Sequence, residues 1–286
     1  MQINKRGMGM TLLIFLILLG LAIPSFIWTR QNVKDLARWH NSRLSPVIMI
    51  PGSSATENRF DALIKKINSR SQKKHSLLKV KVYNDGTIKY SGKINAKDNE
   101  PFIVVGFENN KDGYSNILKQ AKMFDKAFEQ LSEQYEFNNF KAFGHSNGGL
   151  IYTAFLENYL PNYDIQAKVL MTVGTPYNFS ETSLQRKTQM LADFIKNRKK
   201  LPSDLLVYVV AGTETYDSDG LVPERSVEAG KYIYQGIVKH FTQITVTGED
   251  AQHSDLPQND QIIELIDRYV LEQEQNQKTK KLKENS

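Results

Sequence analysis

Cysteine is absent from all 286 residues of the sequence. Its absence excludes disulfide bonds, thiolate metal sites, a cysteine nucleophile and lipid attachment through cysteine. The sequence also lacks zinc-protease and calcium-loop motifs, so we expect neither a metal nor another cofactor. The chain has a net charge of +6, but its basic residues are not combined with aromatic residues in a recognisable nucleic-acid-binding module. We therefore expect a solvated basic surface and no nucleic-acid partner.

Charged residues are also absent from residues 7–29, an apolar run that follows Lys5 and Arg6. A helix that rises 1.5 Å per residue over this run is long enough to cross a hydrocarbon core of about 30 Å. The basic residues before the run predict a cytoplasmic start, with everything after Arg30 outside the cell. The alternative is a signal peptide, but its small residues lie inside the run and Pro24 follows them closely. We predict a single-pass cell-membrane protein, with secretion after cleavage as the alternative.

Short apolar runs alternate with amphipathic segments along the rest of the chain. Strands are expected at Val47–Ile50 and in the segments PFIVVGF, FKAFG, AKVLMTV, DLLVYVV and FTQITVTG, with PFIVVGF and AKVLMTV buried. Between them, Phe124, Phe128, Leu131 and Tyr135 are spaced by four, three and four residues, as on one face of a helix. This alternation predicts the α/β class, with a mostly parallel central sheet and helices on both faces.

A single folded domain is expected after the apolar run. A hairpin over residues 77–92 and a polar, mostly helical segment over residues 179–203 are expected as additions to the sheet. The second addition is either a lid over an acyl pocket or a plain helical excursion. The expected parts are an anchor at 1–29, a juxtamembrane connector at 30–43, the folded domain at 44–272 and a disordered charged tail at 273–286.

A small polar corner, GHSNG at residues 144–148, lies between an expected strand and an expected helix. Its glycines flank Ser146 in the spacing G-x-S-x-G, which suits a strained strand-to-helix turn whose neighbours need to lack side chains. Such a turn raises the serine hydroxyl above the carboxyl edge of the sheet. It also directs the N–H of Asn147, at the start of the helix, toward a developing oxyanion. The pentapeptide by itself is a weak indication and a plain turn is the alternative, but the flanking strand and helix favour a nucleophile.

A serine nucleophile needs a general base and an acid that orients it, and in this type of fold both follow the serine. Of the two histidines downstream, His253 lies in a loop between the last expected strand and the last helix. His240 instead opens a strand, so His253 is the predicted base. Asp219, in the loop after the preceding strand, is the predicted acid, with Asp217 and Glu214 in the same loop as alternatives.

The loop after the first strand, IPGSSAT, is expected to supply a second oxyanion donor. Gly52 permits close approach of the backbone, and the N–H of Ser53 is the candidate, with Ser54 as the next choice. His145 is expected to be a packed structural residue rather than a base, because the side chains of adjacent residues point apart.

Four segments together resemble the α/β hydrolases: EPFIVVGFENN, FKAFGHSNGGL, VLMTVGTPYN and SDGLVPERS…HSDLP. More narrowly, they are similar to the uncharacterised cell-surface hydrolases of Gram-positive bacteria grouped as domain of unknown function 915. The resemblance covers the expected folded domain and implies the α/β-hydrolase fold, with Ser146, Asp219 and His253 as a catalytic triad. The chain departs from the family pattern at Pro51, where relatives usually have histidine, and at Asn147, where methionine is commoner.

Together these features predict an exported serine hydrolase that acts through an acyl-enzyme on an ester carried by a small or lipid-like substrate. Esters are favoured over amides because no peptide-binding feature is visible. Two alternatives are an acyltransferase that acts on a cell-envelope polymer and a non-catalytic surface-binding protein with a hydrolase fold. Contact with the membrane is expected through the N-terminal helix, and no obligate protein partner is indicated.

Overall fold

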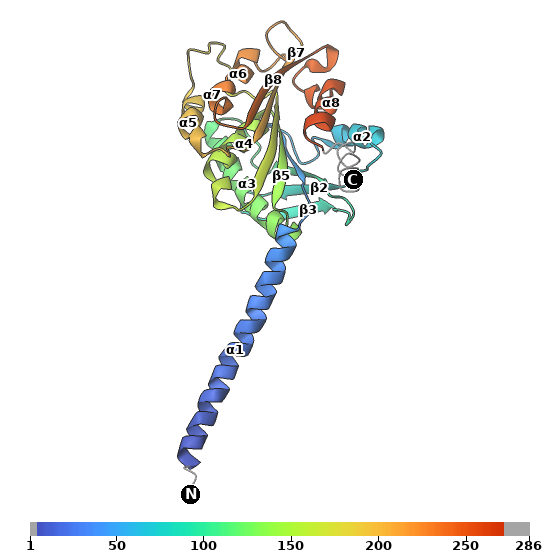
Figure 1. The fold of residues 1–286 in the computed structure, drawn as a ribbon. Helices are drawn as coiled ribbons and strands as arrows, with labels where there is room; N and C mark the ends of the chain where they lie inside the picture. The colour runs from blue at the N-terminus through green and yellow to red at the C-terminus, as the bar shows by residue number, and fades with distance from the viewer. Residues whose placement is uncertain (1–4, 272–286) are drawn as a thin grey trace, which may run out of the picture. The chain divides into compact units, whose positions relative to one another are not determined.

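The computed structural model describes residues 5–271, which form two units divided between residues 42 and 43. The first unit is the long helix α1 (Lys5–His40), shown in blue in Figure 1. Within the described chain, α1 alone contains a stretch, Phe15–His40, that is long and apolar enough to cross a membrane. The expected connector is therefore helical as far as His40. The expected charged tail at 273–286, like residues 1–4, lies outside the described residues.

The second unit is built on one eight-stranded sheet with the order β3-β2-β4-β1-β5-β6-β7-β8. The strands are β1 (Val47–Ile50), β2 (Leu77–Val82), β3 (Ile88–Gly92), β4 (Phe102–Phe107), β5 (Asn139–His145), β6 (Gln166–Val173), β7 (Leu206–Thr213) and β8 (His240–Thr247). All neighbouring strands run parallel except β2 and β3. The predicted mostly parallel sheet is confirmed.

The hairpin of β2 and β3 belongs to this sheet, whereas the sequence suggested an addition to it. Strand β2 pairs with β4 in parallel along its whole length, from Leu77 beside Phe102 to Val82 beside Phe107. Alternate residues of β2 are buried, as expected for a strand with one face packed against the core. Only β3, which is mostly exposed, forms the antiparallel edge.

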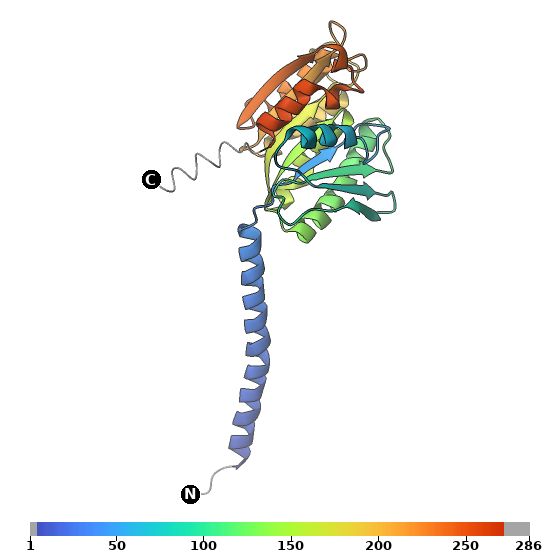
Figure 2. The same cartoon turned by 90° about the vertical axis from the view of Figure 1, so that its right-hand side faces the viewer.

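Helices cover both faces of the sheet (Figure 1). One face is covered by α2 (Asp61–Arg70) and α8 (Asp260–Tyr269), and Figure 2 shows both helices in front of the sheet. The other face is covered by α3 (Tyr114–Tyr135), α4 (Asn147–Asn158), α5 (Gln189–Asn197), α6 (Glu224–Glu228) and α7 (Lys231–Tyr234). This arrangement of layers leaves the carboxyl edge of the parallel strands to the connecting loops.

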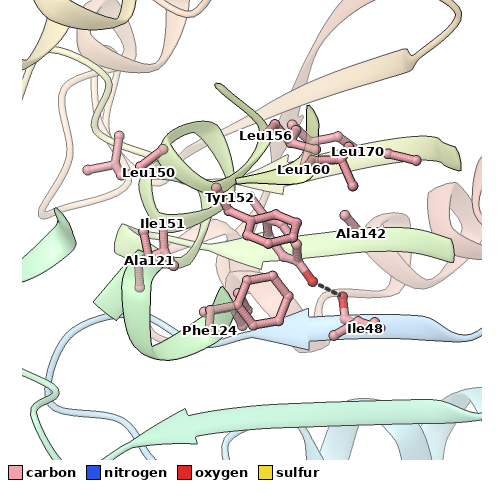
Figure 3. Close-up of a cluster of buried hydrophobic side chains, with 14 of the residues drawn as sticks. Ile48, Ala121, Phe124, Ala142, Leu150, Ile151, Tyr152, Leu156, Leu160 and Leu170 are labelled. Atoms are coloured by element: carbon pink, nitrogen blue, oxygen red, sulfur yellow. Dashed lines mark hydrogen bonds between the residues drawn. The ribbon is translucent and has the colours of Figure 1, made fainter. Parts of the chain in front are cut away.

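Helix α4 packs beside α3 against the sheet, in the larger of the two hydrophobic cores, part of which is shown in Figure 3. The Tyr152 ring packs edge-on against Phe124 with 5.3 Å between ring centroids, and its hydroxyl donates to the carbonyl of Ile48 at 2.7 Å. A buried aromatic ring with a satisfied hydroxyl combines apolar burial with a directional bond. It therefore fixes α4 over strand β1 and holds the start of α4 in place.

The segment 179–203 is less helical than the sequence suggested. Helix is confined to α5 and a following 3₁₀ turn (Arg198–Lys200), whereas residues 179–188 form an irregular loop. Only Phe179 and Leu184 of this mostly polar loop pack against the core, which is too few apolar residues for a buried helical face. Asn178 holds it instead, donating to the carbonyl of Arg186 at 2.7 Å and accepting from the N–H of Thr188 at 2.9 Å.

Candidate active site

Three polar side chains meet at the carboxyl edge of the sheet, each from a different loop. Ser146 follows β5, Asp219 lies between β7 and α6, and His253 follows β8. Nε2 of His253 lies 3.0 Å from Oγ of Ser146, and Nδ1 of His253 lies 2.6 Å from Oδ2 of Asp219. Ser146 and His253 are each 7% exposed and Asp219 is 1% exposed. The structure thus brings the three predicted residues into one hydrogen-bonded series.

Ser146 lies on a sharp turn between β5 and α4. Its backbone has φ 54° and ψ −127°, a conformation that costs a non-glycine residue roughly 1–3 kcal/mol. The turn is held by the Ser146 N–H, which donates to the carbonyl of Val173 at 2.9 Å, and by the hydroxyl of Thr175, which donates to the Ser146 carbonyl at 3.0 Å. A Cβ at Gly148 would lie 2.0 Å from the carbonyl oxygen of Ile50, so only glycine fits there.

Asp219 is fixed on both of its carboxylate oxygens. Oδ1 accepts the backbone N–H groups of Leu221 at 3.1 Å and Val222 at 2.7 Å, while Oδ2 faces Nδ1 of His253. Backbone donors stabilise the ionised carboxylate, which accepts but does not donate. Nδ1 of His253 therefore carries the proton, and the lone pair on Nε2 faces the Ser146 hydroxyl.

The alternative acid and base candidates take other roles. Asp217 contributes its backbone carbonyl, which accepts the Glu224 N–H at 2.8 Å. Within residues 5–271, neither Asp217 nor Glu214 makes a side-chain hydrogen bond to His253. His240 is exposed and begins β8, at the amino edge of the sheet. Of the candidates considered, Asp219 and His253 are the ones that reach the serine.

The backbone of His253, like its ring, is held by hydrogen bonds. Its N–H donates to the carbonyl of Asp219 at 2.7 Å, and its carbonyl lies 3.0 Å from Nε2 of His145. Burial, followed by the electrostatic effect of the neighbouring His253 and Arg59 side chains, holds the pKa of His145 well below its usual value, so its ring is neutral and Nε2–H donates. Arg59 donates to the carbonyl of Ser254 from another side. Sequence reasoning missed both contacts, because they join segments more than 100 residues apart.

Two backbone N–H groups beside the serine are free to donate. The Asn147 N–H begins α4 and has no acceptor within that helix. Gly52 lies against the serine, because a Cβ at Gly52 would be only 2.6 Å from the serine Cβ. Within residues 5–271 the Ser53 N–H has no acceptor, whereas the Ser54 N–H donates to the carbonyl of Asn110 at 2.7 Å. Ser53 is therefore the better placed of the two candidate donors in this loop.

The described residues contain no cluster of side chains suited to bind a metal ion. No group of three or more histidine, aspartate or glutamate side chains there could hold a metal ion. The buried carboxylate of the site, Asp219, already has partners on both oxygens.

Comparisons with known proteins show the family and the fold of the chain. The model of the family described as alpha/beta hydrolase of unknown function (DUF915) matches residues 36–273. A solved structure from Lactobacillus plantarum WCFS1, provisionally described as a cell surface hydrolase, is 55% identical, with a TM-score of 0.74 over 80% of this chain and 92% of that one. The lin2722 gene product of Listeria innocua is 27% identical, with a TM-score of 0.73 over 81% of this chain and 96% of that one. No curated protein matches the chain.

Proposed function

The chain belongs to the DUF915 family of alpha/beta hydrolases of unknown function, and on that premise we propose that it is a serine hydrolase that cleaves carboxylic esters through an acyl-enzyme. The observation that carries the proposal is the contact of 3.0 Å between Oγ of Ser146 and Nε2 of His253, whose Nδ1 lies 2.6 Å from Asp219. A nucleophile beside a base that is itself oriented by an acid is the arrangement that acyl transfer requires.

Acylation begins when Nε2 of His253 accepts the proton of Ser146 as Oγ attacks the ester carbonyl carbon. The carbonyl electron pair moves onto oxygen and forms a tetrahedral oxyanion. Asp219 keeps its bond to the Nδ1 proton and stabilises the imidazolium. The N–H groups of Asn147 and Ser53 donate to the oxyanion, each contributing roughly 3 kcal/mol.

Collapse of this intermediate completes acylation. The imidazolium of His253 gives its proton to the leaving alkoxide, the carbon–oxygen bond of the ester breaks, and the acyl group stays on Ser146. Deacylation repeats these steps with water, which attacks the acyl carbon while giving a proton to His253. Collapse of the second intermediate returns that proton to Ser146 and releases a carboxylic acid. Each turnover consumes one ester and one water, and yields one acid and one alcohol.

We also propose that α1 anchors the enzyme in the cell membrane, with the hydrolase unit on the outer side. Side chains such as Phe26 and Trp28, 66% and 68% exposed, would leave a continuous apolar surface in water, which soluble proteins avoid. Lys5 and Arg6 before the apolar run support a cytoplasmic N-terminus. The cell-surface description of the Lactobacillus relative agrees with export. Mass spectrometry of the mature protein tests the anchor, since loss of the apolar run would indicate a cleaved signal peptide.

Labelling with a fluorophosphonate probe tests the nucleophile in membranes that contain the full chain. We expect the wild-type chain to be labelled and the Ser146→Ala variant to be unlabelled. The purified chain in detergent should hydrolyse p-nitrophenyl esters, and a series of acyl lengths will define the acyl site. Equal rates for Ser146→Ala and the wild type would refute the proposed nucleophile. Product analysis with an added acceptor alcohol separates hydrolysis from acyl transfer.

A further inference from the structure

The loop after β4, with the sequence ENNKDG at residues 108–113, has no part in the triad. It nevertheless makes hydrogen bonds to both segments that carry the proposed oxyanion donors. One of these segments is the loop 52–55 after β1, and the other is the start of α4. A segment bonded to both can determine how far apart the two donors lie.

Asn110 holds the first segment. Its carbonyl accepts the N–H of Ser54 at 2.7 Å, and its side-chain Nδ2 donates to the carbonyl of Ala55 at 3.1 Å. Ser54 has φ 60°, in the left-handed region that a serine does not favour. A strained residue of this kind persists only where its surroundings impose the conformation. The two bonds from Asn110 span this residue, and Ser53 immediately precedes it.

Asp112 holds the second segment. Its Oδ1 accepts Nδ2 of Asn147 at 2.7 Å and also the backbone N–H of Gly113 at 2.6 Å. Asn147 is the residue whose backbone N–H is the other proposed donor. Its side chain is therefore fixed to the loop after β4, and its main chain begins α4.

The loop itself is held by helix α3. Gln120, which is 2% exposed, donates from Nε2 to the carbonyls of Asn109 at 2.6 Å and Lys111 at 3.0 Å. Asn116 donates from Nδ2 to the carbonyl of Asp112 at 2.8 Å. Amides from the packed helix thus bind three backbone carbonyls of the loop, so Asn110 and Asp112 are presented from a fixed frame.

We propose that residues 108–113 form an oxyanion bracket, in which Asn110 and Asp112 are positioning residues that set the Ser53 and Asn147 N–H groups for one oxyanion. The inference rests on the proposed function and adds to it the residues that build the oxyanion site. Hydrogen-bond donors must lie within about 0.5 Å of the productive geometry. Loss of one donor typically lowers kcat roughly 100-fold.

A double-mutant cycle in the full chain tests the bracket. Asp112→Ala and Asn147→Ala each remove one side of the same bond while the backbone N–H of residue 147 remains. We expect each variant to lower kcat about tenfold, with KM changed less than twofold. The double variant should be no slower than the slower single variant, because both changes remove one interaction. Asp112→Asn keeps an acceptor for Asn147 and should recover most of the rate.

Two further readouts separate positioning from a general loss of structure. The bracket has no bond to His253, so the apparent pKa of kcat/KM should be the same in all variants, while phosphonylation of Ser146 should slow in step with kcat. Asp85→Ala is the matched control, because Asp85 also accepts a backbone N–H in a turn, that of Thr87 at 2.8 Å. Asp85→Ala should keep wild-type kinetics.

The outcomes distinguish the bracket from the proposed function itself. If Ser146→Ala abolishes hydrolysis but Asp112→Ala keeps the wild-type rate, the enzyme is correct and the bracket is wrong. Rate losses that multiply in the double variant would also overturn the bracket. Full activity of Ser146→Ala would instead overturn the proposed function.

Discussion

Nε2 of His145 donates to the backbone carbonyl of His253 at 3.0 Å, so the residue before the proposed nucleophile holds the residue proposed as its base. The two rings lie 4.8 Å apart between centroids. His145 is neutral because burial lowers its pKa, and a neutral ring next to His253 does not oppose the imidazolium that forms during catalysis.

Replacement of His145 should therefore affect the base through its backbone. His145→Leu leaves the carbonyl of His253 buried without its donor, which costs about 1–3 kcal/mol of stability. We expect kcat/KM to fall about tenfold. His145→Gln keeps an N–H donor of similar reach and should retain most of the activity. Urea unfolding and ester kinetics measure the two effects, and equal kinetics for Leu and Gln variants would argue against positioning.

The acid assignment can be tested within a single loop. In Asp219→Asn an amide replaces the oxygen that accepts from Nδ1 of His253, which favours the wrong imidazole tautomer. In the serine protease that serves as the reference case the same change lowers kcat about 10⁴-fold, and we expect a loss of that order here. Asp217→Asn, in the same loop, should stay within twofold of the wild type. A larger loss of kcat in Asp217→Asn than in Asp219→Asn would show that Asp217, and not Asp219, orients His253.

Glu157 makes stability depend on pH. It is 1% exposed on α4, and neither of its carboxylate oxygens has a hydrogen-bond partner among the described residues. Burial raises its pKa from 4.5 to about 9, although the positive charge of Lys200 opposes the shift, and Asp193 adds to it. The folded state then holds a proton that the unfolded state has lost above pH 4.5. Stability from this group is complete below pH 4.5 and is lost progressively up to about pH 9.

Glu157→Gln removes this dependence. Relative to the wild type, the free energy of unfolding of the variant should rise by up to about 1.4 kcal/mol for each pH unit across that window. This corresponds to a rise in Tm of roughly 3–6 °C per pH unit. Thermal unfolding of both proteins at about pH 5, 7 and 8.5 measures the difference in their stability. A constant difference between the two proteins at all three values would show that Glu157 does not titrate as inferred.

Steric constraint at the serine turn gives a fourth prediction. In Gly148→Ala the new Cβ would lie 2.0 Å from the carbonyl oxygen of Ile50, which is backbone and cannot swing away. We expect a loss of about 1–3 kcal/mol or more and nearly complete loss of fluorophosphonate labelling. Gly20→Ala is the control, because the added Cβ would meet nothing within 4 Å beyond the neighbouring backbone of its own helix. Normal labelling of Gly148→Ala would contradict the geometry of the turn.

The overall fold could be predicted from the sequence because it depends on periodicity. Apolar runs such as Val47–Ile50 form fully buried strands, and the helix containing Phe124 and Phe128 buries the face predicted for it. The α/β-hydrolase fold is confirmed. The role of the β2–β3 hairpin was misjudged, because an antiparallel turn does not reveal that β2 also pairs with β4.

Only those site residues could be predicted whose order along the chain is typical of the fold. Ser146, Asp219 and His253 lie after successive strands in an order that the fold uses, and the structure brings them together. The contacts of Asn110 and Asp112 could not be predicted in this way. They depend on the positions of the loops relative to one another, and asparagine and aspartate are ordinary residues in any loop.

The position of β1 in the sheet has a mechanical consequence. The chain passes from α1 through residues 41–46 directly into β1, which lies between β4 and β5 and pairs with both in parallel. A pull on the N-terminal segment along the strand would load both ladders in shear, and their hydrogen bonds would have to break together rather than one after another. If α1 anchors the chain as proposed, tension along β1 would therefore load these two ladders before the loops at the carboxyl edge.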